Sequence, residues 1–204
     1  MPTTSQPWAR IVAPVSTVLF VPRSHQPGSP FDESIPKDSN IPAGKHWTDL
    51  PAPGTVVVLS QPAGQICAVL GDIIGGRLKY RGLKGVVADG RVRDIVDLGK
   101  LCEDGKFQVW SRGISTVGTG LEAKPWCVDV PVRIGEVEVR AGDVVVMEKG
   151  ERGAVVIPRE KLQEAVDMLP GLKEADDNVV KDVQAGVDLS ESFKRHRGHY
   201  TQST

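Results

Sequence analysis

The stretch GDIIGGRLKYRGLKGVVADGRVRD, residues 71–94, decides the fold that we predict for this chain. Apolar side chains spaced over residues 73–80 predict a helix, and Gly82 just beyond them is typical of a helix end. The run GVVA at residues 85–88 predicts a buried strand, which we expect to end in a turn at residues 89–90. A helix that lies between two such strands indicates a partly parallel sheet with helices covering it.

Two adjacent glycines interrupt the predicted helix. Gly75 and Gly76 each weaken it by roughly 1 kcal/mol relative to alanine. We therefore expect another part of the backbone or a ligand to approach the helix closely at this point.

Further strands and helices flank this stretch on both sides. Before it, runs of β-branched and apolar residues predict strands at residues 11–21, 55–59 and 67–70. After it, short apolar runs predict strands at residues 107–110, 128–132, 137–139, 143–147 and 154–157. Two helices are expected at residues 159–169 and 172–185, separated by a break at Pro170 and Gly171. The predicted fold class is therefore α/β, a central sheet flanked by helices.

The expected organisation is a single domain over residues 1–204, because this length fits one ordinary core. A long proline-rich loop at residues 22–50 fits a plain surface connection and a lid over a site equally well. The basic and polar tail from about residue 193 is expected to be a solvated end.

The charge balance argues against a nucleic-acid partner. The 25 Lys and Arg nearly cancel the 26 Asp and Glu, which leaves a formal net charge of −1. A nucleic-acid binder needs an excess of positive charge to neutralise phosphates. Four Trp, four Phe and two Tyr also provide few platforms on which bases could stack.

Other compositional features predict a cytoplasmic protein. No run of apolar residues is long enough to cross a membrane, and no secretory signal is visible, so no membrane partner is expected. Three cysteines without a CxxC pair indicate reduced thiols. The four histidines are too scattered to predict a histidine-based metal site or catalytic dyad.

The chemistry is expected at the two ends of the 71–94 stretch. At its start, Gly71, Asp72, Ile73 and Ile74 open a helix, whose first N–H groups suit a carboxylate or phosphate. At its end, Arg93 and Asp94 follow a buried strand, where α/β proteins bind their ligands. An arginine grips a carboxylate through two donors, and an aspartate is a hard ligand for Mg²⁺ or Mn²⁺. By spacing alone, an ordinary surface ion pair is the favoured explanation of Arg93 and Asp94.

The same stretch resembles the signature of the RraA-like family, which includes 4-hydroxy-4-methyl-2-oxoglutarate aldolases. The matching pattern is a Gly-acidic loop at Gly71, a helix that ends in RG, and then GVVADGRVRD. The similarity continues in ARIVAPVSTVLFV at residues 9–21, PGTVV at 53–57 and WSRGI at 110–114. It covers most of the chain, and the long loop resembles that of fungal members.

This resemblance implies a swivelling β/β/α fold, assembled as a homotrimer or a dimer of trimers with sites at subunit interfaces. It implies that the backbone of residues 71–74 binds the substrate carboxylate and that Arg93 binds the carbonyl oxygen and stabilises an enolate. It also implies that Asp94 ligates a divalent cation, Mg²⁺ or Mn²⁺, directly and that Asp72 does so through water. The family's water-mediated glutamate from a neighbouring subunit corresponds best to Glu191.

The activity implied is cleavage of 4-hydroxy-2-oxo acids to pyruvate and a second 2-oxo acid, with oxaloacetate decarboxylation as a side activity. The alternative is a non-catalytic member that binds and inhibits a ribonuclease. Because Asp72, Arg93 and Asp94 are all present, the sequence favours the metal-dependent aldolase.

Overall fold

The computed structural model describes residues 10–28, 35–149 and 153–198. These residues form two compact units, which divide in sequence between Arg159 and Glu160. The described strands and two helices lie in the first unit, and the two C-terminal helices form the second. The 71–94 stretch therefore belongs wholly to the first unit.

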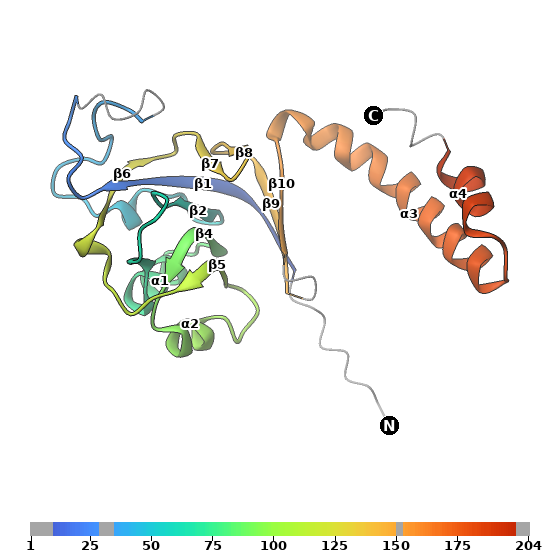
Figure 1. Cartoon of the computed structure of the whole chain (residues 1–204), viewed down its shortest axis with the longest axis horizontal. Helices are drawn as coiled ribbons and strands as arrows, with labels where there is room; N and C mark the ends of the chain where they lie inside the picture. Colours follow the sequence, from blue (N-terminus) through green and yellow to red (C-terminus); the bar gives the residue numbers. More distant parts are fainter. Residues whose placement is uncertain (1–9, 29–34, 150–152, 199–204) are drawn as a thin grey trace. The chain divides into compact units, whose positions relative to one another are not determined.

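A mixed sheet of eight strands forms the centre of the first unit (Figure 1). Its path runs β10-β9-β1-β2-β4-β3, with β5 also paired to β4 and β6 also paired to β1. Strands β2, β3, β4 and β5 run parallel to their neighbours, whereas β6 and β9 run antiparallel to β1. The strands of this sheet are β1 (Arg10–Pro22), β2 (Val56–Ser60), β3 (Ala68–Leu70), β4 (Gly85–Val92), β5 (Gln108–Ile114), β6 (Ala123–Val128), β9 (Val144–Glu148) and β10 (Gly153–Ile157). The predicted α/β class is confirmed.

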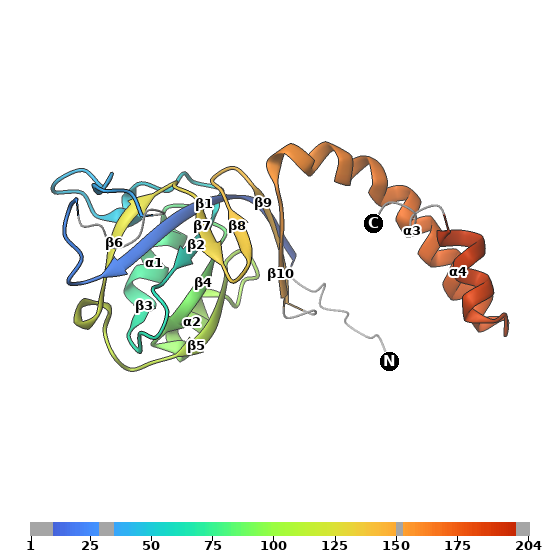
Figure 2. The ribbon, with the colours of Figure 1, turned by 45° about the horizontal axis from the view of Figure 1, so that its top comes forward.

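Apolar side chains pack against both faces of the sheet. On one face, Val92 joins Leu78 of α1 (Asp72–Tyr80) and Leu98 of α2 (Ile95–Leu101) in one buried cluster. The opposite face packs against the hairpin of β7 (Val132–Ile134) and β8 (Val137–Val139). Figure 2 shows that helices α1 and α2 lie beside β3, β4 and β5. The central parallel strands are thus covered on both faces, which explains their continuous apolar runs.

One of the two helix glycines is required by close packing. A Cβ atom at Gly75 would lie 2.6 Å from Cδ2 of Leu98, so helix α2 is what approaches α1 at this point. A Cβ atom at Gly76 would meet nothing within 4 Å. A close approach is therefore found at Gly75, where it is made by a side chain of α2, and no protein atom makes one at Gly76.

The turn predicted at residues 89–90 is wrong, because β4 continues through it to Val92. Arg91 pairs with Ala68 of β3 on one side and with Gly113 of β5 on the other. Neighbours on both sides keep the chain extended, and an irregular register after Ala88 accommodates the Asp-Gly pair as a bulge.

The strand predicted at residues 128–132 is also wrong. Strand β6 ends at Val128, and Asp129 adopts a left-handed φ of 58° before β7 begins at Val132. A left-handed residue reverses the chain locally and ends the strand. Helix α2 was not predicted at all, although Asp94 before an apolar segment is a helix-start pattern.

The second unit is a pair of helices, α3 (Leu162–Gln184) and α4 (Leu189–Arg197). Ala175 and Val179 of α3 are buried, and Asp182 accepts hydrogen bonds from Ser192 and His196 of α4. The predicted break at residues 170–171 is wrong, since α3 passes through it. Proline removes one N–H donor, and the helical bonds on either side of it still form. The residues from 193 to 197, expected to be a solvated tail, belong to α4.

Candidate active site at the carboxyl ends of β3 and β4

The first part of the site is the start of helix α1. Gly71 is the residue before the helix and carries no side chain to cap it, so the first N–H groups point out from the end of β3. The Asp72 carboxylate accepts a hydrogen bond of 2.7 Å from the Ile73 N–H. The remaining N–H groups and the positive end of the helix dipole suit an anionic group.

The second part of the site follows strand β4. The Arg93 N–H donates to the Leu70 carbonyl oxygen at 2.9 Å, which holds the ends of β4 and β3 together. Asp94 has a left-handed backbone with φ 56° and begins helix α2. Aspartate is one of the few side chains that tolerates this conformation. The turn directs the chain sharply from the strand into α2 and places Asp94 at the sheet edge.

Gly71, Arg93 and Asp94 converge on one point. A Cβ atom at Gly71 would lie 2.6 Å from Oδ2 of Asp94 and 2.9 Å from Nε of Arg93. The absence of a side chain at Gly71 is what allows both charged groups to approach the start of α1. A Cβ atom at Gly118 would lie 3.3 Å from Nη1 of Arg93, so this guanidinium is bordered by glycine on two sides.

Arg93 and Asp94 also form an ion pair, with 3.2 Å between Nε and Oδ2. Their side chains are 42% and 38% exposed, so the pair itself contributes little to stability. An ion pair of this kind was the ordinary explanation of these residues, and it is present. The ion pair is compatible with a further role in ligand binding, because both side chains also lie beside Gly71 at the start of α1.

The carboxylates at the site fit a water-rich cation site. Among the described residues, no group of three His, Cys, Asp or Glu side chains could together hold a metal ion. Asp72 and Asp94 are hard oxygen donors, and Mg²⁺ usually binds proteins through one or two carboxylates and keeps several waters. The donor set therefore fits Mg²⁺ or Mn²⁺ and does not fit a closed structural zinc site. Glu191, the third predicted carboxylate, lies on α4 and pairs with Arg195 at 2.7 Å.

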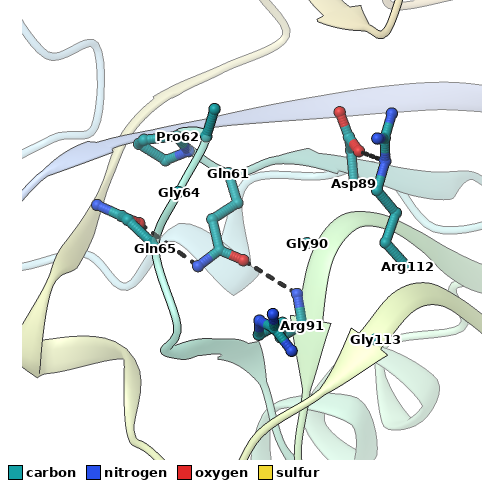
Figure 3. Close-up of a pocket in the computed structure, with 10 residues that line it drawn as sticks. Gln61, Pro62, Gly64, Gln65, Asp89, Gly90, Arg91, Arg112 and Gly113 are labelled. Atoms are coloured by element: carbon teal, nitrogen blue, oxygen red, sulfur yellow. Dashed lines mark hydrogen bonds and ion pairs between the residues drawn. The ribbon is translucent and has the colours of Figure 1, made fainter.

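A pocket that the sequence did not predict adjoins this part of the sheet (Figure 3). It has a volume of about 290 Å³ and lies between the loop after β2 and the ends of β4 and β5. Its lining includes Asp89, Arg91 and Arg112 together with Gln61 and Gln65. The Asp89-Gly90 pair in β4 is the sequence feature that marks this pocket. A turn at this pair, as the sequence predicts, would place the pocket side chains outside the sheet.

The Asp89 carboxylate inside this pocket is largely buried, with 14% of its side chain exposed. Burial raises its pKa above the ordinary value, and the ion pair with Arg112 opposes that rise. Gln61 fixes the opposite wall, since its Oε1 accepts from the Arg91 N–H at 3.0 Å and its Nε2 donates to the Cys67 carbonyl at 2.8 Å.

None of the described helices is long and apolar enough to span a membrane. The fold and the site together define a class: α/β proteins with a candidate site where parallel strands end. The chain belongs to the RraA-like family, described as Aldolase/RraA, and residues 1–156 match the family model.

Individual relatives agree with this assignment. A Halalkalibacterium halodurans protein, provisionally named a 4-hydroxy-4-methyl-2-oxoglutarate aldolase, is 31% identical over 126 residues, which are 62% of this chain and 56% of that protein. An uncharacterized protein of Methanocaldococcus jannaschii is also 31% identical, over 60% of this chain and 55% of its own length. The chain spans little more than half the length of these curated relatives.

Solved structures show the same fold. Streptomyces coelicolor RraAS2, named an unusual member of the RNase ES inhibitor RraA family, superposes with a TM-score of 0.65 at 27% identity, covering 82% of this chain and 76% of that one. An uncharacterized protein of Pseudomonas syringae superposes with a TM-score of 0.67 at 23% identity, covering 90% and 78%.

Proposed function

We propose that this protein is a divalent-metal-dependent class II pyruvate aldolase. Its substrates would be 4-hydroxy-2-oxo acids of the 4-hydroxy-4-methyl-2-oxoglutarate type, cleaved to pyruvate and a second 2-oxo acid. The observation that carries this proposal is the convergence of Arg93 and Asp94 on Gly71 at the start of α1. The provisional aldolase name of a 31% identical relative supports it.

Substrate binding begins with the substrate's own carboxylate. The backbone of Gly71, Asp72, Ile73 and Ile74 forms the N-terminus of α1. Its N–H groups other than that of Ile73, which donates to Asp72, are available to a carboxylate, which also gains from the helix dipole. This places the adjacent 2-oxo group beside Arg93, whose guanidinium borders the same glycine.

The cleavage step leaves negative charge on the 2-oxo oxygen, as the enolate of pyruvate. Arg93 supplies a fixed positive charge and planar donors at that position, and such preorganised stabilisation is commonly the largest single contribution to catalysis. Asp72 would hold the water that takes the proton from the C4 hydroxyl. Decarboxylation of oxaloacetate produces the same enolate, so the same residues would support it.

Asp94 would hold the divalent cation directly, and Asp72 would reach it through water. When bound, such a cation acts as a Lewis acid toward the carboxylate and carbonyl oxygens of a 2-oxo acid. Glu191 of a neighbouring subunit would complete the water shell in a homotrimer or hexamer. We also propose that residues 1–204 act as a single domain and that the protein is cytoplasmic. The loop at residues 22–50 is either a surface connection or a lid over the site.

The alternative is a non-catalytic regulator, since a relative of known structure is named a member of a ribonuclease inhibitor family. The decisive experiment measures pyruvate release from 4-hydroxy-4-methyl-2-oxoglutarate and from oxaloacetate, with EDTA and then with added Mg²⁺ or Mn²⁺. We expect release that chelation abolishes and either cation restores. Absence of release under all conditions, together with inhibition of a ribonuclease, would support the regulator.

A further inference from the structure

We infer that the pocket beside β4 is a second carboxylate subsite, in which Arg91 binds the far carboxylate of a dicarboxylic 2-oxo acid. This inference rests on the proposed function, because it extends a substrate held at Arg93. It assigns a ligand chemistry to side chains that the cleavage step does not use.

Arg91 lies near the carboxyl end of β4, two residues before Arg93. Val92 points into the buried cluster that includes Leu78 and Leu98 of the helices. Side chains alternate along a strand, so Arg91 lies on the other side from Val92, and Arg93 is the first residue after β4 ends. Residues two apart on a strand are separated by about 6–7 Å. With C–C bonds of about 1.5 Å, the 2-oxo carbon and the far carboxyl carbon of an extended five-carbon diacid lie about 4 Å apart, a span that two arginine side chains at this spacing can bracket.

The charges of the pocket match one carboxylate. Its three charged side chains are Arg91, Arg112 and Asp89, so two positive groups and one negative group leave a net charge of +1. Arg112 is committed to Asp89 through its Nε. Asp89 neutralises the charge of Arg112, whereas Arg91 has no carboxylate partner among the described residues, and in Figure 3 it lies on the other side of Gly90 from the Asp89–Arg112 pair.

The position of Arg91 is fixed by contacts that leave most of its donors for a ligand. Its Nη1 donates to the Ile114 carbonyl oxygen at 3.1 Å, and its backbone N–H is held by Gln61. A guanidinium carries five N–H donors, so one such bond orients the group without exhausting it. A Cβ atom at Gly90 would clash with Oε1 of Gln61, so glycine at this position is what lets Gln61 reach the strand.

The test uses two ligands that cannot undergo the cleavage because they lack the 4-hydroxyl group. 2-Oxoglutarate has the far carboxylate, whereas 2-oxopentanoate has the same chain length without it. Calorimetry with Mg²⁺ present gives both dissociation constants for the wild type, Arg91→Gln, Arg91→Lys and the control Lys100→Gln. Lys100 lies on α2 and pairs with Asp97, so its substitution removes one positive charge away from the pocket.

We expect the wild type to bind 2-oxoglutarate about tenfold more tightly than 2-oxopentanoate, as one charge-assisted bidentate contact would give. Arg91→Gln should abolish that preference and leave the 2-oxopentanoate constant unchanged. Arg91→Lys should retain part of the preference, and Lys100→Gln all of it. An equal effect of Arg91→Gln on both ligands, or a wild type without preference, would overturn the subsite.

The outcome is separable from that of the proposed function. Pyruvate release without a preference for the diacid would refute the subsite alone. A preference that depends on Arg91, without any pyruvate release, would refute the aldolase assignment alone.

Discussion

At the scale of single residues, Arg93 and Asp94 are adjacent, but we expect their substitutions to impair catalysis in different ways. Arg93→Lys keeps the charge and loses the planar donors, so we expect kcat for pyruvate release to fall by roughly 10²–10³-fold. Asp94→Asn should weaken binding of the cation, so its loss of activity should diminish as the concentration of Mg²⁺ or Mn²⁺ is raised. Steady-state kinetics across a metal titration measures both. Near-normal turnover of either correctly folded variant would reduce the pair to the exposed ion pair that it also forms.

Substitution of Gly71 tests the site by a steric effect alone, because it adds a methyl group and changes no charge. Gly71→Ala would place a methyl group 2.6 Å from the Asp94 carboxylate and 2.9 Å from Arg93, so both side chains must move. We expect pyruvate release to fall at least about tenfold, with less than about 1 kcal/mol of lost stability, because the displaced atoms are half-exposed. The matched control is Gly76→Ala on the same helix, where a Cβ atom meets nothing within 4 Å. That control should keep full activity and gain about 0.5–1 kcal/mol of stability from helix propensity.

At the scale of elements, the pairing of β4 with β5 includes the Asp89–Arg112 ion pair, which predicts a pH dependence. Arg112→Gln leaves a largely buried carboxylate without its partner, at a cost of about 1–2 kcal/mol at pH 7. Burial already raises the pKa of Asp89, and loss of Arg112 removes the opposing influence and raises it further. Protonation at acidic pH then neutralises the unpaired group, so the stability difference from the wild type should shrink as pH falls.

Urea unfolding of the wild type and Arg112→Gln at pH 7 and at pH 4 measures this dependence. Asp89→Asn combined with Arg112→Gln is the control, because it removes the titrating group. A deficit that grows toward acidic pH would contradict the assignment.

Helix α3 carries its own prediction, since Pro170 lies within it. Pro170→Ala restores an N–H donor and removes the clash with the preceding turn, so the second unit should become more stable, by up to about 3 kcal/mol. Circular dichroism during thermal unfolding would show the gain as greater helicity and a higher midpoint. A lower midpoint would instead indicate that the proline ends a helix, as the sequence predicts.

At the scale of the whole molecule, the surroundings of the site favour assembly. Ile73, Ile95 and Val96 are 75%, 52% and 69% exposed beside the starts of α1 and α2. Apolar side chains gathered around a site are typical of a surface that another chain covers. We expect light scattering to give a trimer or hexamer of the 22.0 kDa chain. Val96→Glu should shift the measured mass toward that of the monomer and should lower pyruvate release to the same extent. A monomer with full activity would contradict a site that is completed by a second subunit.

The sequence by itself determined the fold class and the positions of the candidate site residues along the 71–94 stretch. The apolar strands, the helix that ends before Gly82 and the position of Arg93 after a buried strand all follow from local periodicity and turn chemistry, which neighbouring residues decide. The RG and DGRVRD pattern was also sufficient to place the chain near its family.

Only the tertiary structure decided the rest. The Asp89-Gly90 pair favours a turn locally, but pairing of Arg91 with β3 and β5 holds it in the sheet and creates a pocket. The closeness of Gly71 to the Arg93 and Asp94 side chains likewise brings together residues more than twenty positions apart. Local preferences differ by about 1 kcal/mol per residue, so hydrogen bonds and packing from distant strands override them, and a sequence pattern read locally does not contain those partners.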